Sequence, residues 1–320
     1  MEPTPPAGHD SAARLKSSLL GMIGSFVLFT TYLAVPPIGV FSGVLAPFPA
    51  GYSRLVHGRP AALIVTLGAA TAVSALFGIF AGCLYLGMCA TIGLFMPELL
   101  ARGIGGGRTL FWTTAVNVTI LAAGVLGYSA LSGINLQQLL SAEINGSLTQ
   151  AVAIYEKSGV KGDDLELVKQ TMNTVADMLH RLYPSLITLL LVVMAGCNLA
   201  LLKRTTVKSG IELNVGDFAS YRNPDMLVWL LIAAGFALLL TSPLVTTPAL
   251  NIMLIVALLY FLQGMAVVST LISKQSFSGM LRTGLYIMLV IQPYLAAVIA
   301  GIGLCDLWVD FRTPKQQENL

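Results

Sequence analysis

Long uncharged apolar runs constrain this chain more than any other feature. A helix needs about 20 apolar residues to cross a bilayer, and runs of about that length recur between Ser17 and Leu304. Of the 320 residues, 56% are hydrophobic and only 10% are charged, whereas soluble proteins average about 25% charged residues. We therefore expect an all-α fold, a polytopic transmembrane helical bundle of about eight to nine spans.

The alternation of polar and apolar segments predicts five regions. They are a polar tail over 1–16, a membrane bundle of about five spans over 17–131, an amphipathic helical hairpin over 132–183, a membrane bundle of about four spans over 184–308, and a polar tail over 309–320. The first apolar run is longer than the core of a signal peptide, which is up to about 15 residues. We interpret it as a retained span.

Two stretches of the first bundle decide the number of spans. Segment 36–53 is interrupted by Pro47 and Pro49, so it is either a bent span or a re-entrant segment. Segment 61–100 carries one charge, Glu98, and is twice as long as a span needs. It is expected to form two helices with a tight turn near 78–82. The count of eight or nine spans, and the side of the C-terminus, depend on segment 36–53.

The polar stretch 132–183 has the pattern of two amphipathic helices. Apolar residues recur every three or four positions on both sides of the break KSGVKGDD, which is the period of a helix with one apolar face. A hairpin lying on its own membrane domain is the favoured interpretation, and a partner-binding arm is the alternative. Amphipathicity alone does not separate them.

Basic residues predict the orientation of the spans. With nine spans and a cytoplasmic N-terminus, the cytoplasmic segments hold 12 Lys and Arg and the outer segments hold 6, which agrees with the excess of basic residues in cytoplasmic loops. This orientation places loops 203–225 and 273–282 in the cytoplasm and the hairpin 132–183 outside it.

The sequence lacks the residues that several classes of function require. A net charge of +3 leaves no concentrated basic face, so no nucleic-acid partner is expected. The cysteines form no CxxC pair and have no histidine nearby; they are Cys83, Cys89, Cys197 and Cys305. No H-E-x-x-H, G-x-S-x-G or Walker A motif is present. We therefore expect no catalytic residues, no cofactor and no metal site.

Polar residues inside the apolar runs are the candidate ligand-binding or helix-packing residues, because an uncompensated polar group in hydrocarbon is costly. These candidates are Asn251, Tyr260, Gln263, Gln292 and Tyr294. Tyr260 and Gln263 lie three residues apart, so both can touch one small ligand. Interhelical hydrogen bonding is the alternative role for all five.

Asp306 and Asp310 form a candidate carboxylate pair. They lie four residues apart, on one face if the last helix continues through them. Two carboxylates at this spacing suit cation binding or acid–base chemistry. At the end of a span, however, they more often solvate the helix terminus or pair with a basic loop.

Three stretches carry a family resemblance: DFASYRNPDMLVWLLIAAG from Asp217, NIMLIVALLYFLQGMAVVS from Asn251, and GIGLCDLWVDFR from Gly301. They resemble the YybS-like family of uncharacterised bacterial multi-pass membrane proteins. The resemblance implies a bacterial inner-membrane protein with no assigned reaction. The arrangement of spans is also distantly similar to the substrate-capture subunits of energy-coupling-factor transporters, by analogy of fold alone.

Two hypotheses of function follow. The first is a protein that binds or transports a small uncharged or apolar solute, with Pro-interrupted helices beside a cavity. The second is a non-catalytic membrane scaffold that docks a protein partner through hairpin 132–183. The lipid bilayer is the partner that both hypotheses share.

Overall fold

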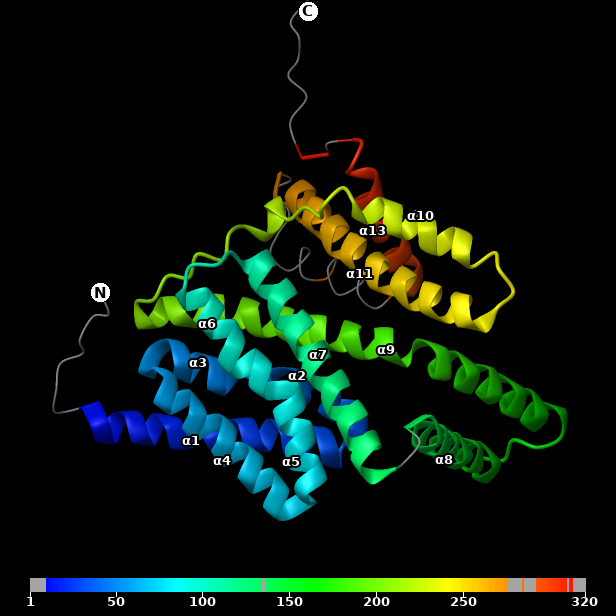
Figure 1. Cartoon of the computed structure of the whole chain (residues 1–320), viewed down its shortest axis with the longest axis horizontal. Helices are drawn as coiled ribbons and strands as arrows, with labels where there is room; N and C mark the ends of the chain where they lie inside the picture. The colour runs from blue at the N-terminus through cyan, green and yellow to red at the C-terminus, as the bar shows by residue number, and fades with distance from the viewer. Residues whose placement is uncertain (1–9, 134–135, 275–283, 285–291, 310, 313–320) are drawn as a thin grey trace, which may run out of the picture. The chain divides into compact units, whose positions relative to one another are not determined.

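The computed structural model describes residues 10–133, 136–274, 284, 292–309 and 311–312 (Figure 1). All regular secondary structure in these residues is helical, which confirms the helical bundle. Six helices are long and apolar enough to cross a membrane, and Leu227–Ala237 and Tyr294–Cys305 are shorter apolar helices. The expected count of eight to nine spans is not confirmed by these lengths. The chain divides into two compact units, described in turn.

Unit 1 comprises Met1–Ile134 and Leu190–Gly216. Its first helices are α1 (Asp10–Ala34), α2 (Pro36–Leu45), α3 (Phe48–His57) and α4 (Arg59–Phe77). Helix α1 packs against the other three. The 36–53 segment thus forms α2 and the first part of α3. Each of these helices has ten residues and is about 15 Å long, which is half of the hydrocarbon thickness. Neither helix crosses a bilayer by itself.

The expected break in segment 61–100 is confirmed. Gly78 separates α4 from α5 (Ile79–Tyr85) with a positive φ of 89°, a backbone conformation that glycine adopts at little cost. The helix then continues through a π-helical stretch, η1 (Leu86–Phe95), into α6 (Met96–Ala101). The side chain of Asn117 on α7 (Gly106–Ser132) donates a 3.0 Å hydrogen bond to the carbonyl of Met88 within η1.

Buried apolar side chains and a few polar anchors hold unit 1 together. The Ser25 hydroxyl of α1 donates to the carbonyl of Ala46 at 2.7 Å and lies 2.7 Å from the Tyr85 hydroxyl. The side chain of Asn198 donates to the carbonyl of Val44 at 2.7 Å. These bonds satisfy polar groups that would be costly to bury alone.

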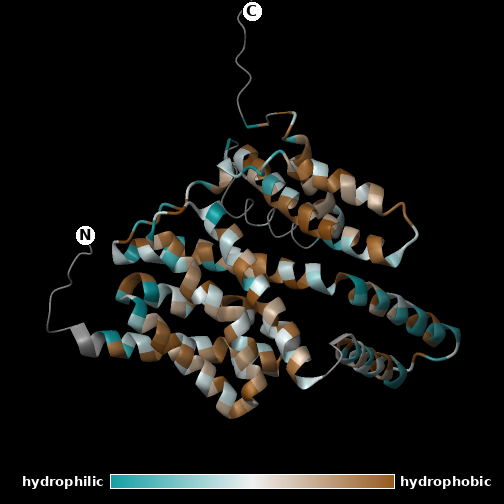
Figure 2. Cartoon of the chain, viewed as in Figure 1, coloured by the Kyte–Doolittle hydropathy of each residue, from teal (hydrophilic) through white to brown (hydrophobic). Residues whose placement is uncertain are grey.

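Unit 2 comprises Asn135–Leu189 and Asp217–Leu320. Its described helices include α8 (Leu136–Lys157), the first part of α9 (Asp163–Thr206), η3 (Phe218–Ser220), α10 (Leu227–Ala237), α11 (Pro243–Lys274) and α13 (Pro293–Cys305). The two helices of the hairpin are present, and Figure 2 shows their hydrophilic residues. Helix α9, which has 44 residues in total, continues past Tyr183 without interruption.

An amide side chain explains how α9 passes through Pro184. Proline lacks an N–H and normally kinks a helix. The Asn251 side chain accepts a 2.9 Å hydrogen bond from the N–H of Ser185 and donates one of 2.7 Å to the carbonyl of Arg181. These two backbone groups are partners in a regular helix, so the amide of Asn251 replaces the bond they would make with each other.

Helices α11 and α13 approach each other closely and run antiparallel. A Cβ added at Gly264 would meet the backbone of Ile299, and one added at Gly303 would meet the backbone of Tyr260. Small residues at such positions let two backbones come into contact, a common device in membrane helix pairs. This contact positions the end of α13 beside the middle of α11.

Candidate functional site

A buried polar cluster lies in unit 2, where α13 ends beside α11. The amide of Gln263 donates to Asp306 Oδ2 at 3.0 Å, and Arg312 Nη2 donates to the same oxygen at 2.8 Å. The side chain of Asp306 is only 3% exposed. Burial of a carboxylate is costly unless it is paired and hydrogen-bonded, and Arg312 supplies the compensating charge.

The segment before α10 completes this cluster. The N–H of Asn223 donates to Gln263 Oε1 at 3.0 Å, and the Asn223 side chain donates to the carbonyl of Leu259 at 2.8 Å. Tyr221 donates to Asn223 Oδ1 at 2.9 Å, and burial raises the pKa of the Tyr221 hydroxyl. Both the oxygen and the nitrogen of the Gln263 amide therefore have a hydrogen-bond partner.

The three stretches that carry the family resemblance meet in this cluster. Asn223 belongs to the first stretch, Gln263 to the second, and Asp306 and Arg312 to the third. Arg222 adds contacts of 3.3 and 3.4 Å to the carbonyls of Asp306 and Leu307. Asp306 Oδ1 is buried without a partner among the described residues.

The other candidate residues lie in different surroundings. Asn251 bonds to the backbone of α9 beside Pro184, and the Tyr260 hydroxyl is buried without a partner in the described part of the chain. Gln292 precedes α13 and is exposed, and Tyr294 is 82% exposed. The structure thus joins Gln263 to Asp306 and leaves Gln292 and Tyr294 at the surface. Asp310 lies outside the described residues.

A second charged cluster lies in unit 1, around Glu98 of α6. Arg54 at the end of α3 and Arg59 at the start of α4 each place an Nη2 atom 2.6 Å from this carboxylate. Arg102, just after α6, lies 3.3 Å from it. Three positive charges therefore surround one negative charge.

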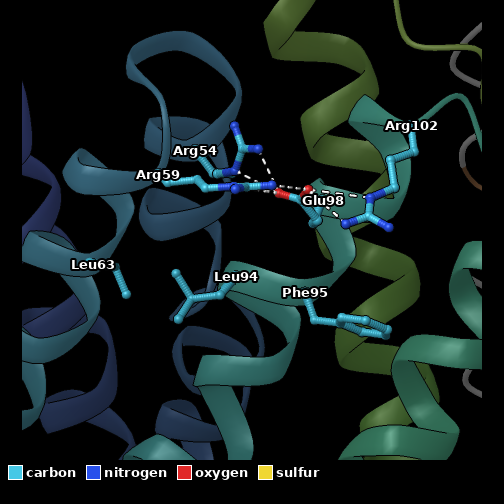
Figure 3. Close-up of a pocket in the computed structure, with 7 residues that line it drawn as sticks. All are labelled: Arg54, Arg59, Leu63, Leu94, Phe95, Glu98 and Arg102. Carbon is cyan, nitrogen blue, oxygen red and sulfur yellow. Dashed lines mark hydrogen bonds and ion pairs between the residues drawn. The ribbon is translucent and has the colours of Figure 1, made fainter.

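This cluster forms one side of an open cavity of about 400 Å³ (Figure 3). Its lining residues are Arg54, Arg59, Leu63, Leu94, Phe95, Glu98 and Arg102. The side chains of Arg59 and Arg102 are 67% and 65% exposed, whereas Glu98 is 19% exposed. The cavity combines a basic rim with an apolar wall.

Local sequence patterns do not reveal this second cluster. In the sequence, Glu98 is the one charge of an apolar run, and the arginines are loop residues that set the orientation of the spans. The feature of the sequence that could have indicated this cluster is a carboxylate close to the end of a span, with basic loops on both sides of the run. Among the described residues, no group of three or more His, Cys, Asp or Glu side chains could hold a metal ion.

The six apolar helices and the buried polar contacts between them define a polytopic helical membrane protein. A family model described as "Predicted membrane protein (DUF2232)" matches residues 25–307, and the chain belongs to this family. The match confirms the expected membrane protein family at the level of that description, which does not include the YybS-like name. No curated protein and no solved structure shows a significant match to the chain.

Proposed function

We propose that this membrane protein is a non-catalytic scaffold that docks a partner protein through its hairpin, formed by α8 and residues 163–183 of α9. The observation that carries the proposal is an exposed apolar face on α9. Leu167 is 63% exposed and Met178 is 58% exposed, and Val175 between them is also exposed. Large apolar side chains exposed on a charged helix are typical of an interaction surface.

Leu167 and Met178 lie apart from the half-buried apolar residues of α9. Leu165, Val168 and Met172 are half-buried, and they follow the three- and four-residue spacing of one helix face. Leu167 and Met178 lie eleven residues apart, which is about three turns, and so share a different side of the helix. Helix α9 therefore carries apolar side chains on more than one side.

Charge indicates the chemistry of the partner. Residues 132–183 contain four Lys and Arg against six Asp and Glu, and the ion pair between Lys169 and Glu156, at 3.7 Å, uses one of each. Opposite charges around an apolar contact favour specific pairing. An amphipathic helix with basic residues beside its apolar stripe fits this surface.

Site-specific crosslinking tests the docking surface. A photoreactive amino acid at position 178 of the full chain, in its native membrane, should crosslink to one discrete protein that contains a basic amphipathic helix. The same amino acid at position 173, an exposed polar site on a different side of α9, should not. The substitutions L167Q and V175Q together should abolish the crosslink at 178. Equal crosslinking at 173 and 178, or reaction at 178 with lipid alone, would contradict the proposal.

Binding of a small uncharged or apolar solute is the second proposal. The buried Tyr260 hydroxyl supports it, because a buried polar atom without a partner is rare and suits a ligand contact. A small molecule that copurifies with the full chain and is lost from Y260F, in native mass spectra, is the expected result. Retention of the same molecule by Y260F would remove Tyr260 from the site.

The proposed membrane is the bacterial inner membrane, with a cytoplasmic N-terminus and an extracytoplasmic hairpin. The distribution of Lys and Arg supports this orientation. In a background without the four native cysteines, K161C should react with an impermeant thiol reagent in cells stripped of their outer barrier, and K208C should be protected. The reverse pattern would invert the orientation.

A further inference from the structure

Helix α11 indicates how deep the residues of unit 2 lie in the membrane. All of α11 before Lys274 is uncharged. Asn251 bonds to α9 beside Pro184, where the polar hairpin meets an apolar run. Gln263 lies 12 residues after Asn251 and 11 residues before Lys274, which is about 18 and 16 Å along the helix. Because the hydrocarbon core is about 30 Å thick, Gln263 lies close to its middle.

An irregular segment lies beside this part of α11. It covers residues 217–226, and its regular structure is the single turn of η3. The N–H of Asn223 donates to Gln263 Oε1 at 3.0 Å. The carbonyl of Ala219 accepts a hydrogen bond from Thr270 at 3.4 Å. The segment therefore runs along α11 from the bilayer midplane toward the C-terminal end of the helix.

This segment is exposed although it lies at membrane depth. Asn223 is its one buried residue, and the exposed residues include three with charged side chains, which are Asp217, Arg222 and Asp225. The bilayer core offers no hydrogen bonds to irregular backbone, so such backbone occurs there only where protein buries it or where it lines a water-filled cavity. Exposed charged side chains are also costly in hydrocarbon. The exposed backbone and charges of this segment therefore require water around them.

Helix α13 lies at the same depth and has the opposite kind of surface. A Cβ added at Gly303 would meet the backbone of Tyr260, and one added at Gly264 would meet the backbone of Ile299. The helix contains no charged residue, and its Val298 is 58% exposed. An exposed apolar helix suits the hydrocarbon of the bilayer. One level of α11 thus lies beside an element that suits lipid and an element that requires water.

We propose that residues 217–226 line a water-filled recess that runs from one face of the membrane to Gln263, near the bilayer midplane. The recess opens on the side of Lys208, because no apolar run of span length separates Lys208 from this segment. It ends at the buried pair of Gln263 and Asp306. Its ligands are water and the small hydrophilic solutes that water carries. The recess requires neither a partner at the hairpin nor a solute at Tyr260.

Labelling of introduced cysteines tests the recess in the full chain, in membrane vesicles and in a background without the four native cysteines. S220C and D225C lie in the segment, V298C is the lipid-facing control at the same depth, and K208C reports the side of the membrane. The probe is an impermeant sulfonated maleimide, added to vesicles of the orientation in which K208C reacts.

The segment and the control should react at very different rates. S220C and D225C should react within about tenfold of the rate of K208C, because water lets their thiols ionise. V298C should react at least about 100-fold more slowly, because apolar surroundings suppress the thiolate, which is the reacting form. S220C exchanges only an oxygen for a sulfur, so it reports the recess even where D225C fails to fold.

Three results would overturn the proposal. Rates for S220C and D225C as low as that of V298C would show that lipid or protein covers the segment. A rate for V298C as high as theirs would place this level of α11 outside the hydrocarbon core. Reaction of D225C only in vesicles of the opposite orientation would place the opening on the wrong face.

Nitroxide spin labels at positions 220 and 298 give a second measurement that does not depend on thiol ionisation. The label at 220 should collide mainly with a water-soluble nickel complex. The label at 298 should collide mainly with oxygen, which partitions into hydrocarbon. Equal ratios of nickel to oxygen collisions at the two positions would contradict a recess filled with water.

Discussion

Each unit of this molecule contains a carboxylate that is paired with arginine, and the two clusters are built differently. In unit 2, Asp306 is buried and shares one oxygen between Arg312 and the amide of Gln263. In unit 1, Glu98 lies at the wall of an open cavity and binds three arginines. Among the described residues, Asp306 has one ion-pair partner and Glu98 has three.

The difference in burial predicts a difference in how much each cluster contributes to stability. A buried ion pair is costly to break from one side, because the remaining charge stays buried. A partly exposed cluster is stabilised little by its ion pairs. We therefore expect the Asp306 cluster to contribute more to the stability of the fold than the Glu98 cluster does.

The largest expected effect on stability is that of D306A. The substitution would remove the carboxylate oxygen that accepts from both Arg312 and the Gln263 amide, which should lower the free energy of unfolding by about 3–5 kcal/mol. Unfolding of the full chain in mixed micelles measures the change. D164A removes an exposed acid from the first turn of α9 and should cost less than about 1 kcal/mol. Equal costs for the two substitutions would mean that the Asp306 cluster contributes no special stability.

A smaller effect is expected from G303A, which tests whether close packing of α11 and α13 supports the buried cluster. The added methyl group would meet the backbone of Tyr260 and force the helices apart, at a cost of about 1–3 kcal/mol. Gly301 lies two residues away, and a Cβ there meets nothing within 4 Å. G301A should therefore be neutral or slightly stabilising, since alanine favours a helix. A cost for G301A as large as that for G303A would exclude close packing as the cause.

Local patterns in the sequence predicted the class of fold and some of its breaks. The length of the apolar runs gave a helical membrane protein, and glycine at position 78 gave the turn within segment 61–100. The continuity of α9 through Pro184 was not predictable in this way. It depends on Asn251, which lies 66 residues from Ser185 in the chain, and no local pattern pairs the two.

Local patterns also did not predict which candidate residues contact each other. Gln263 was selected as a polar residue of an apolar run and Asp306 as one member of a carboxylate pair, but their pairing across 43 residues comes from the contact between α11 and α13. Arg54 and Glu98, 44 residues apart, were assigned to a loop and a span. Periodicity identifies the faces of helices, whereas the choice of neighbouring helix depends on packing over the whole unit.

The third prediction concerns Asn251 and tests a second source of stability in unit 2. N251A should cost about 1–2 kcal/mol of unfolding free energy, the range of hydrogen bonds between membrane helices. In a P184A background the helix can make its own bond between Ser185 and Arg181, so the same substitution should cost much less. A double-mutant cycle in mixed micelles measures the difference. Additive effects of N251A and P184A would show that the amide does not compensate for the proline.

The smallest expected effect on stability is that of E98Q, which tests the comparison at the partly exposed cluster of unit 1. Glu98 is partly exposed, so replacing it should change the free energy of unfolding by about 1 kcal/mol or less. The loss arises from repulsion among three arginines, and it should shrink when salt is raised, because the Debye length falls from about 10 Å at 0.1 M to 3 Å at 1 M. Unfolding in mixed micelles at both salt concentrations measures this change. A loss as large as that of D306A, unchanged by salt, would make Glu98 a buried structural acid and remove the distinction between the two clusters.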